Sequence, residues 1–250
     1  MTQAVAPARG TRPEGTQTEA EASGKVREMF TQIAPRYDLL NHVLSLQLDR
    51  LWRARTARIL RPILQRPEAV VLDLCCGTGD LALALARAGR ARIIGADFAH
   101  PMLVQARAKS AAAIPFLEAD ALRLPFADAS FDLVTAAFGF RNLANYEEGL
   151  REMRRVLKPG GTLAILEFTE PPEGILGDAY RWYFRQILPR IGAMLSGDRE
   201  AYTYLPRSVA RFFRPQQLAE LMSTVGFAAV KYRVWTMGTV ALHTAVRGTG

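Results

Sequence analysis

Residues 71–82, which read VLDLCCGTGDLA, contain the side chains and spacing best suited to chemistry in this chain. Gly77 and Gly79 allow the backbone to turn sharply and to pass close to a ligand. The helical pattern that begins behind them would present free amide groups and a partial positive charge to a carboxylate or phosphate. Asp97 ends the next apolar run, where a carboxylate can accept hydrogen bonds from ribose hydroxyls. Together these features predict a nucleoside site.

The identity of the nucleoside depends on the residues around the glycines. Residues 77–82 satisfy the dinucleotide fingerprint G-x-G-x-x-A, so a nicotinamide dehydrogenase is one interpretation, and a glycine turn without a ligand is another. Asp73 favours a third, because a carboxylate before the glycines would repel a pyrophosphate and attract the ammonium group of an amino acid. Farther along, Arg155-Val-Leu-Lys-Pro-Gly-Gly161 ends a helix and leads into a strand. This combination resembles the class I S-adenosylmethionine-dependent methyltransferases.

The elements that must position these residues alternate along the chain. Apolar runs predict strands at 69–74, 91–97, 114–118, 131–138, 162–168, 228–235 and 239–246, and helical spacing predicts helices at 79–88, 100–110, 145–157 and 215–225. Only residues 236–238 separate the last two strands, too few for a parallel crossover, so these strands should pair antiparallel. We therefore expect an α/β, Rossmann-like class I methyltransferase sheet, mostly parallel with an antiparallel last strand and helices on both faces.

The domain organisation follows from composition and periodicity. Residues 1–24 mix Pro, Gly, Thr and Glu without periodicity and are expected to form a disordered tail. Residues 25–250 would form a single methyltransferase domain with a helical cap at 25–66 and a helical insertion at 171–214. The insertion has an apolar stripe at helical spacing, which suggests cover for the domain, a lid over an apolar substrate or a contact with lipid headgroups. Its members are Leu176, Tyr180, Tyr183, Ile187, Ile191 and Met194.

Composition narrows the function classes. Hydrophobic residues make up 49% of the 250 residues and charged residues 22%, as in soluble globular proteins, and no apolar stretch reaches the ~18 residues of a membrane span. No secretory signal or transit peptide is recognisable, so a cytoplasmic location is expected. The net charge of +8 permits nucleic acid or an anionic membrane, but no basic cluster is interleaved with aromatics, so no nucleic-acid partner is expected. The two cysteines are neighbours and the three histidines are scattered, so no metal site is expected.

Several further segments carry a closer resemblance. They are Tyr37-Asp38-x-x-Asn41-x-x-Leu44-Ser45, Arg50-x-Trp52, Phe138-Gly139-Phe140-Arg141-Asn142, Arg155 to Glu167, Tyr204-Leu205-Pro206-x-Ser208-Val209 and Ala241-Leu242-His243. Over about residues 25–247 the chain resembles the quinone C-methyltransferases that make menaquinone and ubiquinone. It departs from the usual pattern of that family at Leu40, Gln47, Asp49, Ala137 and Thr169. Aspartate in place of histidine at position 49 removes one candidate general base.

The resemblance implies methyl transfer from S-adenosylmethionine to a ring carbon of a prenylated demethylmenaquinol, with S-adenosylhomocysteine as the second product. A benzoquinol precursor of ubiquinone, RNA and other small molecules remain alternative acceptors. A peripheral contact with the inner face of the cell membrane is one expectation for so apolar an acceptor. The implied cofactor residues are Asp73, Gly77, Thr78, Gly79, Asp97, Phe98, Met102, Asp120 and Ala121, and the implied substrate residues are Tyr37, Asp38, Arg141, Asn142 and Tyr204.

The chemistry expected of these residues starts from ionisation of a ring hydroxyl, which makes the neighbouring carbon nucleophilic. For a hydroxyl with a pKa of ~10, ionisation at pH 7 costs about 4 kcal/mol. A unit positive charge ~4 Å away in a partly shielded site recovers roughly that amount, and Arg141 could supply it. Asn142 would orient an oxygen, and either water or His243 would accept the proton.

Overall fold

The computed structural model describes residues 10–38, 45, 47–170, 174, 204 and 207–249. Within this part of the chain, seven strands form one sheet in the order β3-β2-β1-β4-β5-β7-β6. The strands are β1 (Val70–Leu74), β2 (Arg92–Asp97), β3 (Phe116–Glu118), β4 (Phe131–Ala137), β5 (Leu157–Phe168), β6 (Phe227–Trp235) and β7 (Val240–Arg247). The helices are α1 (Glu19–Ile33), α3 (Leu48–Leu64), α4 (Asp80–Ala88), α5 (His100–Lys109), α6 (Tyr146–Val156) and α10 (Pro215–Thr224). Three short 3-10 turns are η1 (Ala34–Arg36), η2 (Phe140–Asn142) and η4 (Thr236–Gly238).

The sheet has the predicted mixed topology. Strands β1 to β5 pair in parallel, whereas β7 runs antiparallel to both β5 and β6. The predicted antiparallel pairing of the last two strands is therefore confirmed. The strand predicted to start at residue 162 begins earlier, because Leu157 already pairs with Phe131 and a register shift follows.

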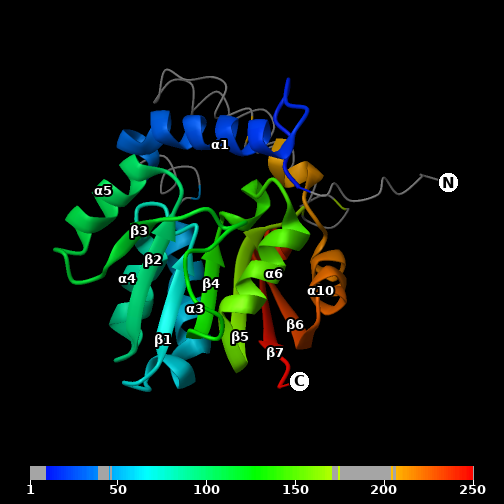
Figure 1. Cartoon of the computed structure of the whole chain (residues 1–250). Coiled ribbons are helices and arrows are strands. Elements are labelled where there is room, and N and C mark those ends of the chain that lie inside the picture. Colours follow the sequence, from blue (N-terminus) through cyan, green and yellow to red (C-terminus); the bar gives the residue numbers. More distant parts are fainter. Residues whose placement is uncertain are drawn as a thin grey trace.

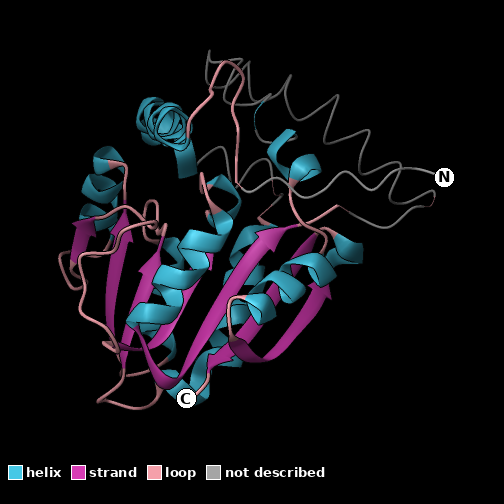
Figure 2. Cartoon of the chain, turned by 45° about the vertical axis from the view of Figure 1, so that its right-hand side comes forward, coloured by secondary structure: helices cyan, strands magenta, loops and turns pink. Residues whose placement is uncertain are grey.

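Helices cover both faces of the sheet, as predicted (Figure 2). Helices α3, α4 and α5 bury apolar side chains such as Leu60, Leu85 and Leu103 against one face. Helices α6 and α10 bury Leu150 and Leu218 against the other. Helix α1 crosses over the edge at which the parallel strands end, above β1 and β4 (Figure 1). Helix α1 therefore covers the carboxyl ends of the parallel strands.

The N-terminal prediction needs a correction, because residues 10–24 are ordered rather than a disordered tail. The hydroxyl of Thr18 accepts the Glu21 amide at 3.2 Å, and the Glu21 carboxylate accepts the Thr18 amide at 3.2 Å. This capping box starts α1 six residues before the predicted cap at 25–66. The Thr11 amide donates to the carbonyl of Leu143 at 2.8 Å, which ties the segment to the domain. Composition averaged over residues 1–24 concealed the local Thr-x-x-Glu signal.

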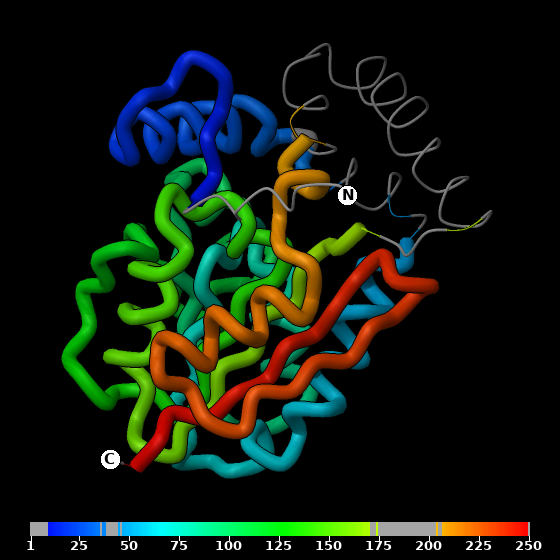
Figure 3. The backbone as a smooth tube through the Cα atoms, turned by 90° about the vertical axis from the view of Figure 1, so that its right-hand side faces the viewer, coloured from blue at the N-terminus to red at the C-terminus, as the bar shows by residue number. Residues whose placement is uncertain are grey.

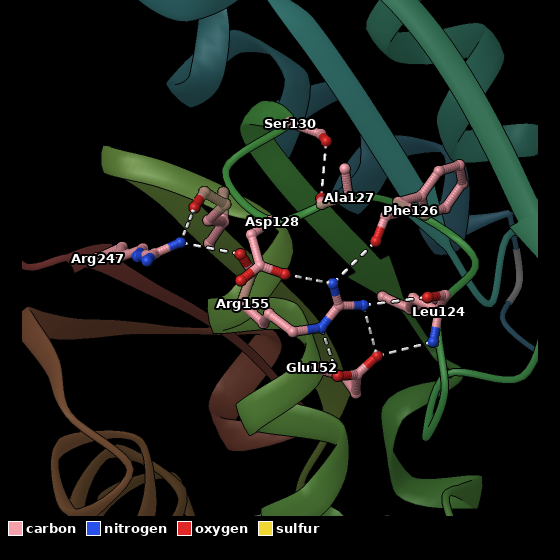
Figure 4. Close-up of polar contacts among 9 residues, drawn as sticks. Leu124, Phe126, Ala127, Asp128, Ser130, Glu152, Arg155 and Arg247 are labelled. Carbon is pink, nitrogen blue, oxygen red and sulfur yellow. Dashed lines mark hydrogen bonds and ion pairs between the residues drawn. The ribbon is translucent and has the colours of Figure 1, made fainter.

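Arg155, the first residue of the motif before β5, has a structural role (Figure 4). Its guanidinium donates to the carboxylates of Asp128 and Glu152, each at 2.7 Å. It also donates to the carbonyl oxygens of Leu124 and Phe126. These contacts hold the connection between β3 and β4 against α6, and that connection contains the cofactor candidates Asp120 and Ala121.

The predicted insertion at 171–214 and its apolar stripe lie mostly outside the described residues, which here include only 174, 204 and 207–214. Within the described chain, no helix combines the length and apolar character needed to cross a bilayer.

Candidate functional site

A cavity of about 640 Å³ lies at the carboxyl ends of the parallel strands. This volume includes space open to solvent, and this edge is where open α/β sheets bind ligands. Helix α1 contributes Ser23 and Phe30 to the wall, a contribution that the predicted tail and cap did not anticipate. The cavity brings together eight of the predicted site residues: Tyr37, Gly77, Asp97, Phe98, Met102, Asp120, Ala121 and Asn142.

The glycine loop after β1 has the geometry that its sequence predicts. Gly77 and Gly79 both adopt positive φ angles, +54° and +83°. A Cβ at Gly79 would also lie 3.0 Å from the ring of Phe116, so a side chain there would be both strained and crowded. Asp97 fixes this loop, because its carboxylate accepts the Gly77 amide and the Ala99 amide, each at 2.9 Å. Burial raises the pKa of Asp97 despite these two hydrogen bonds.

Asp73 is fully buried at the end of β1, where it lines a second, smaller cavity of about 310 Å³. Its Oδ1 accepts the hydroxyl of Thr135 at 2.8 Å, whereas its Oδ2 has no close hydrogen-bond partner among the described residues. Burial raises the pKa of Asp73 to about 7, although the Thr135 hydroxyl, the backbone amide of Ala82 in α4 and the charge of Arg53 oppose the shift. A buried carboxylate oxygen without a close partner is costly unless a ligand completes it. An ammonium group is the ligand that this oxygen fits.

Arg53 lies in the same small cavity, and the sequence reasoning missed it. Its guanidinium pairs with Asp49 and lies 3.6 Å from Asp80 at the start of α4. The cavity therefore contains a buried acid, Asp73, next to the N-terminus of α4, whereas Asp49 and Asp80 compensate the charge of Arg53. The acid suits an ammonium group and the helix N-terminus suits a carboxylate. The only sequence signal was the position of Arg53 directly after the Arg50-x-Trp52 segment.

Arg141, predicted to stabilise a phenolate, is 5% exposed and is already paired. Its Nη1 lies 2.8 Å from Oε1 of Glu167, and its backbone amide donates to Oε2 of the same carboxylate at 3.1 Å. Nη1 also donates to the carbonyl of Phe138, and Nε donates to the hydroxyl of Ser208 at 3.4 Å. The guanidinium is absent from the cavity wall. The estimate for a free unit charge therefore does not apply, because Glu167 compensates that charge.

Asn142 follows Arg141 and does reach the cavity. Its Oδ1 accepts the hydroxyl of Tyr204 at 3.0 Å, and the same hydroxyl lies 3.0 Å from Oγ1 of Thr11. Burial raises the pKa of Tyr204, so this hydroxyl remains protonated at neutral pH. Tyr204 thus orients Asn142 from behind the cavity wall.

Tyr37 and Asp38, both predicted to bind the substrate, have different surroundings in the structure. Tyr37 lines both cavities and meets the ring of Phe30 with a centroid separation of 6.0 Å. The Asp38 carboxylate instead accepts the hydroxyl of Thr78 and pairs with Nζ of Lys109 at 2.6 Å. Asp38 therefore attaches the N-terminal segment to the glycine loop, and neither cavity includes it.

His243 is not placed to accept a proton in the cavity, and its predicted catalytic role needs correction. It is 2% exposed on β7 beneath α10, and its Nε2–H donates to the carbonyl of Pro215 at 2.8 Å. Burial lowers the pKa of His243 to about 4, so the ring is neutral at physiological pH. The residue serves the packing of α10 on the sheet.

Three aromatic side chains beside the cavity were also missed. Phe138 lines the cavity and adopts φ +60°, a strained conformation of the kind found at functional sites. Its ring lies 4.6 Å from that of Phe168, whose ring lies 6.0 Å from that of Trp52. These rings form a continuous aromatic wall between the cavity and the start of α3. The Phe-Gly-Phe motif and Trp52 were visible in the sequence, but their contact was not.

Among the described residues, no group of three or more His, Cys, Asp or Glu side chains is arranged to hold a metal ion.

Comparison with known proteins places this site in a family. A family model described as the ubiE/COQ5 methyltransferase family matches residues 17–247. The demethylmenaquinone methyltransferase of Thermus thermophilus is 51% identical over 223 residues, 88% of this chain and 100% of that protein. The demethylmenaquinone methyltransferase of Deinococcus radiodurans is 52% identical over 221 residues, 87% of this chain and 90% of that protein.

Solved structures confirm the predicted fold. A SAM-dependent methyltransferase of Thermotoga maritima, described as a possible histamine N-methyltransferase, has a TM-score of 0.64 at 20% identity, covering 89% of this chain and 99% of that chain. The 4+2 cyclase SpnF has a TM-score of 0.67 at 18% identity, covering 97% of this chain and 100% of that chain. These identities are too low to carry more than the fold. The family model and the two bacterial relatives confirm the resemblance drawn from the motifs, and the chain belongs to the ubiE/COQ5 methyltransferase family.

Proposed function

We propose that this chain transfers a methyl group from S-adenosylmethionine to a ring carbon of a demethylmenaquinol, giving menaquinol and S-adenosylhomocysteine. The observation that carries the choice of acceptor is the 51% identity to a demethylmenaquinone methyltransferase over the whole length of that protein. The family membership carries the methyl transfer itself.

The two cavities suit the two halves of S-adenosylmethionine. The small cavity offers Asp73 to the ammonium group, and the N-terminus of α4 behind the glycine loop to the carboxylate. The larger cavity offers Asp97 to the ribose hydroxyls, and the side chains of Phe98 and Met102 to the adenine faces. Gly77 lines both cavities, so one extended ligand could occupy both. When bound, S-adenosylmethionine supplies an electrophilic methyl group on a positively charged sulfur.

The chain itself would bind and orient the acceptor. Phe138 offers an aromatic ring to the quinol at the cavity wall, and Phe168 and Trp52 pack behind it. Asn142, held by Tyr204, is placed to hydrogen-bond an oxygen of that ring at the cavity. Orientation of this kind lowers the barrier by holding the reacting atoms in line.

The sequence predicted that the positive charge of Arg141 would stabilise the phenolate of the acceptor, but the charges in the reaction call for a different role. In the transfer the ring carbon of the phenolate would take the methyl group as its bond to sulfur breaks, so the negative and the positive charge both disappear and neutral S-adenosylhomocysteine leaves. The methylated carbon then loses its own proton, which restores the aromatic ring. An apolar wall that excludes water favours such a neutralisation, because the charges attract more strongly there than in water. Arg141 then acts through position: its pairing with Glu167 fixes η2, which carries Asn142. The proton would leave to water, since His243 is remote from the cavity wall.

A direct transfer assay tests the proposal. Purified protein is incubated with methyl-labelled S-adenosylmethionine and, in separate reactions, a short-chain demethylmenaquinol, the corresponding demethylated benzoquinol and total RNA. Label is expected in the naphthoquinol product, at the ring carbon by mass spectrometry. Asn142→Ala should reduce turnover by about 10- to 100-fold while the affinity for S-adenosylhomocysteine stays unchanged, because the lost hydrogen bond serves the acceptor.

The other outcomes are equally decisive. Label in the benzoquinol alone would transfer the assignment to ubiquinone synthesis, and label in RNA alone would reject a quinol acceptor. Equal losses of turnover and cofactor affinity in Asn142→Ala would move that residue into the cofactor site.

A further inference from the structure

One corner of the described part of the chain combines exposed cations with exposed apolar side chains. Leu51 on α3 is 59% exposed, and Met237 in the η4 turn between β6 and β7 is 65% exposed. These are two of the five large hydrophobic residues that stand out as exposed among the described residues. Single exposed apolar residues need no explanation, but a group at one corner does.

The two elements that carry this group are in direct contact. The indole of Trp52 donates to the hydroxyl of Thr236 at 2.8 Å, and the guanidinium of Arg55 lies 5.0 Å from the ring centre of Trp235. The β6–β7 turn lies at the carboxyl edge of the sheet, beside the start of α3 (Figure 3). Leu51 and Met237 therefore stand at neighbouring points of one edge.

Cations flank this apolar edge. Arg55 and Arg58 lie on the same side of α3 as Leu51, at the helical spacing i+4 and i+7. Lys231 and Arg233 alternate with Trp235 along the edge strand β6 and so share its face of the sheet. All four are exposed, and none forms an ion pair with an acid of the described chain. We call this surface, made of Leu51, Arg55, Arg58, Lys231, Arg233 and Met237, the α3–hairpin corner.

We propose that the α3–hairpin corner docks this enzyme on an anionic lipid bilayer. Unpaired arginine and lysine side chains around a small apolar tip are complementary to anionic headgroups over hydrocarbon. Nucleic acid would also attract the cations, but it offers nothing to solvent-exposed Leu51 and Met237. The net charge of +8 adds a long-range attraction in the same direction.

The position of the corner relative to the cavity supports this choice. Trp52, which bonds to the hairpin, is the first ring of the aromatic wall that continues through Phe168 to Phe138 at the cavity. The corner and the cavity therefore lie at the two ends of one packed aromatic cluster, which places the proposed bilayer contact close to the proposed acceptor site. The link to the acceptor rests on the proposed function, whereas the docking itself does not.

Vesicle binding without any substrate tests the docking. The full chain is sedimented with vesicles of pure phosphatidylcholine and with vesicles that also contain phosphatidylglycerol, at low and at high salt. Binding is expected only with phosphatidylglycerol and should weaken with salt. Each cation near an anionic surface contributes about fivefold to binding, so Arg55→Gln with Arg233→Gln should weaken it about 25-fold. Leu51→Gln with Met237→Gln should weaken it by about tenfold or more.

Matched controls come from exposed residues of the same types elsewhere. Arg90→Gln with Arg92→Gln removes two exposed arginines at the start of β2, and Val104→Gln removes an exposed apolar side chain on α5. Both should bind vesicles like the parent protein. All variants should bind S-adenosylhomocysteine normally and keep their melting temperatures, since each altered side chain is exposed.

The proposal is overturned if the parent protein ignores phosphatidylglycerol, or if the corner and control variants lose binding equally. It is also overturned if the parent protein binds RNA instead of the vesicles and if Arg55→Gln with Arg233→Gln weakens that RNA binding. Methyl-transfer assays distinguish a failure of the docking proposal from a failure of the proposed function. A short-chain quinol in detergent should be methylated normally by the Arg55→Gln, Arg233→Gln variant, and a long-chain quinol in anionic vesicles should not. Transfer to neither acceptor by the parent protein would count against the function, whatever the vesicles show.

Discussion

Replacement of Asp73 by asparagine should make the cofactor-free protein more stable at alkaline pH and at the same time remove most of its affinity for S-adenosylhomocysteine. The side chain is fully buried, and its pKa is raised to about 7 because burial penalises the charged form. In the unfolded chain the same carboxyl titrates near its ordinary value of about 3.9.

The sign of the pH effect follows from these two values. Between pH 4 and pH 7 the unfolded chain has released the proton of Asp73 while the native protein still holds it. The native state binds more protons, so stability falls as the pH rises through this window and stays low above it. The shift of the pKa to about 7 corresponds to about 4 kcal/mol at pH 8, which Asp73→Asn should largely recover.

Cofactor binding should depend on pH in the opposite sense. An ammonium group needs the ionised carboxylate, and roughly a tenth of Asp73 is ionised at pH 6 against about nine-tenths at pH 8. The affinity for S-adenosylhomocysteine should therefore rise roughly tenfold from pH 6 to pH 8. In Asp73→Asn this slope should vanish.

Calorimetric titration with S-adenosylhomocysteine and thermal unfolding without it, both at pH 6, 7 and 8, measure the two effects. Thr135→Val removes the hydrogen bond to Oδ1, so it should move the midpoint of the affinity profile to higher pH. Asp132→Asn is the control, because this carboxylate pairs with Lys158 at the other end of the sheet and should leave the profile unchanged. A pH-independent affinity in the parent protein, or no gain in stability of Asp73→Asn at pH 8, would refute the reasoning.

Four further substitutions check the remaining assignments. Glu167→Gln and Arg141→Gln should each lower the free energy of unfolding by about 3–5 kcal/mol, because each leaves a buried charge unpaired. Urea titration of both variants and of the double variant measures the coupling between the two side chains. Additive losses in the double variant would show that the two charges do not stabilise each other. His243→Gln should keep kcat in the transfer assay. It should also lose the acid sensitivity of the parent, in which the native ring stays neutral down to about pH 4 while the unfolded ring protonates below about 6.5; a large fall in kcat would restore a catalytic role. Asp97→Ala should weaken cofactor binding by about 1–3 kcal/mol and speed hydrogen exchange at the Gly77 amide, whose acceptor it removes.

The local parts of this protein could be predicted from neighbouring residues. The turn at Gly77 and Gly79 needs positive φ angles, which glycine adopts without strain, and the helix after it follows its apolar spacing. The short link at residues 236–238 allowed only an antiparallel pair. The capping box at Thr18 was equally local, and it was missed because the segment was judged by its average composition.

The roles of individual site residues depended on contacts between distant segments. Arg141 meets Glu167 because β4 and β5 are neighbours in the sheet, and this contact turns a supposedly free cation into a neutralised pair. His243 loses its capacity to accept protons because α10 folds over it and its Nε2–H is committed to Pro215.

The sequence by itself therefore determined the fold class, the family and the chemistry of the cofactor loop, since each depends on residues close together in the chain. Only the tertiary structure decided which charges are compensated, which hydroxyls are held and which rings form a wall. Burial and pairing arise from segments far apart in sequence, and they set the pKa and the orientation of every group in the site.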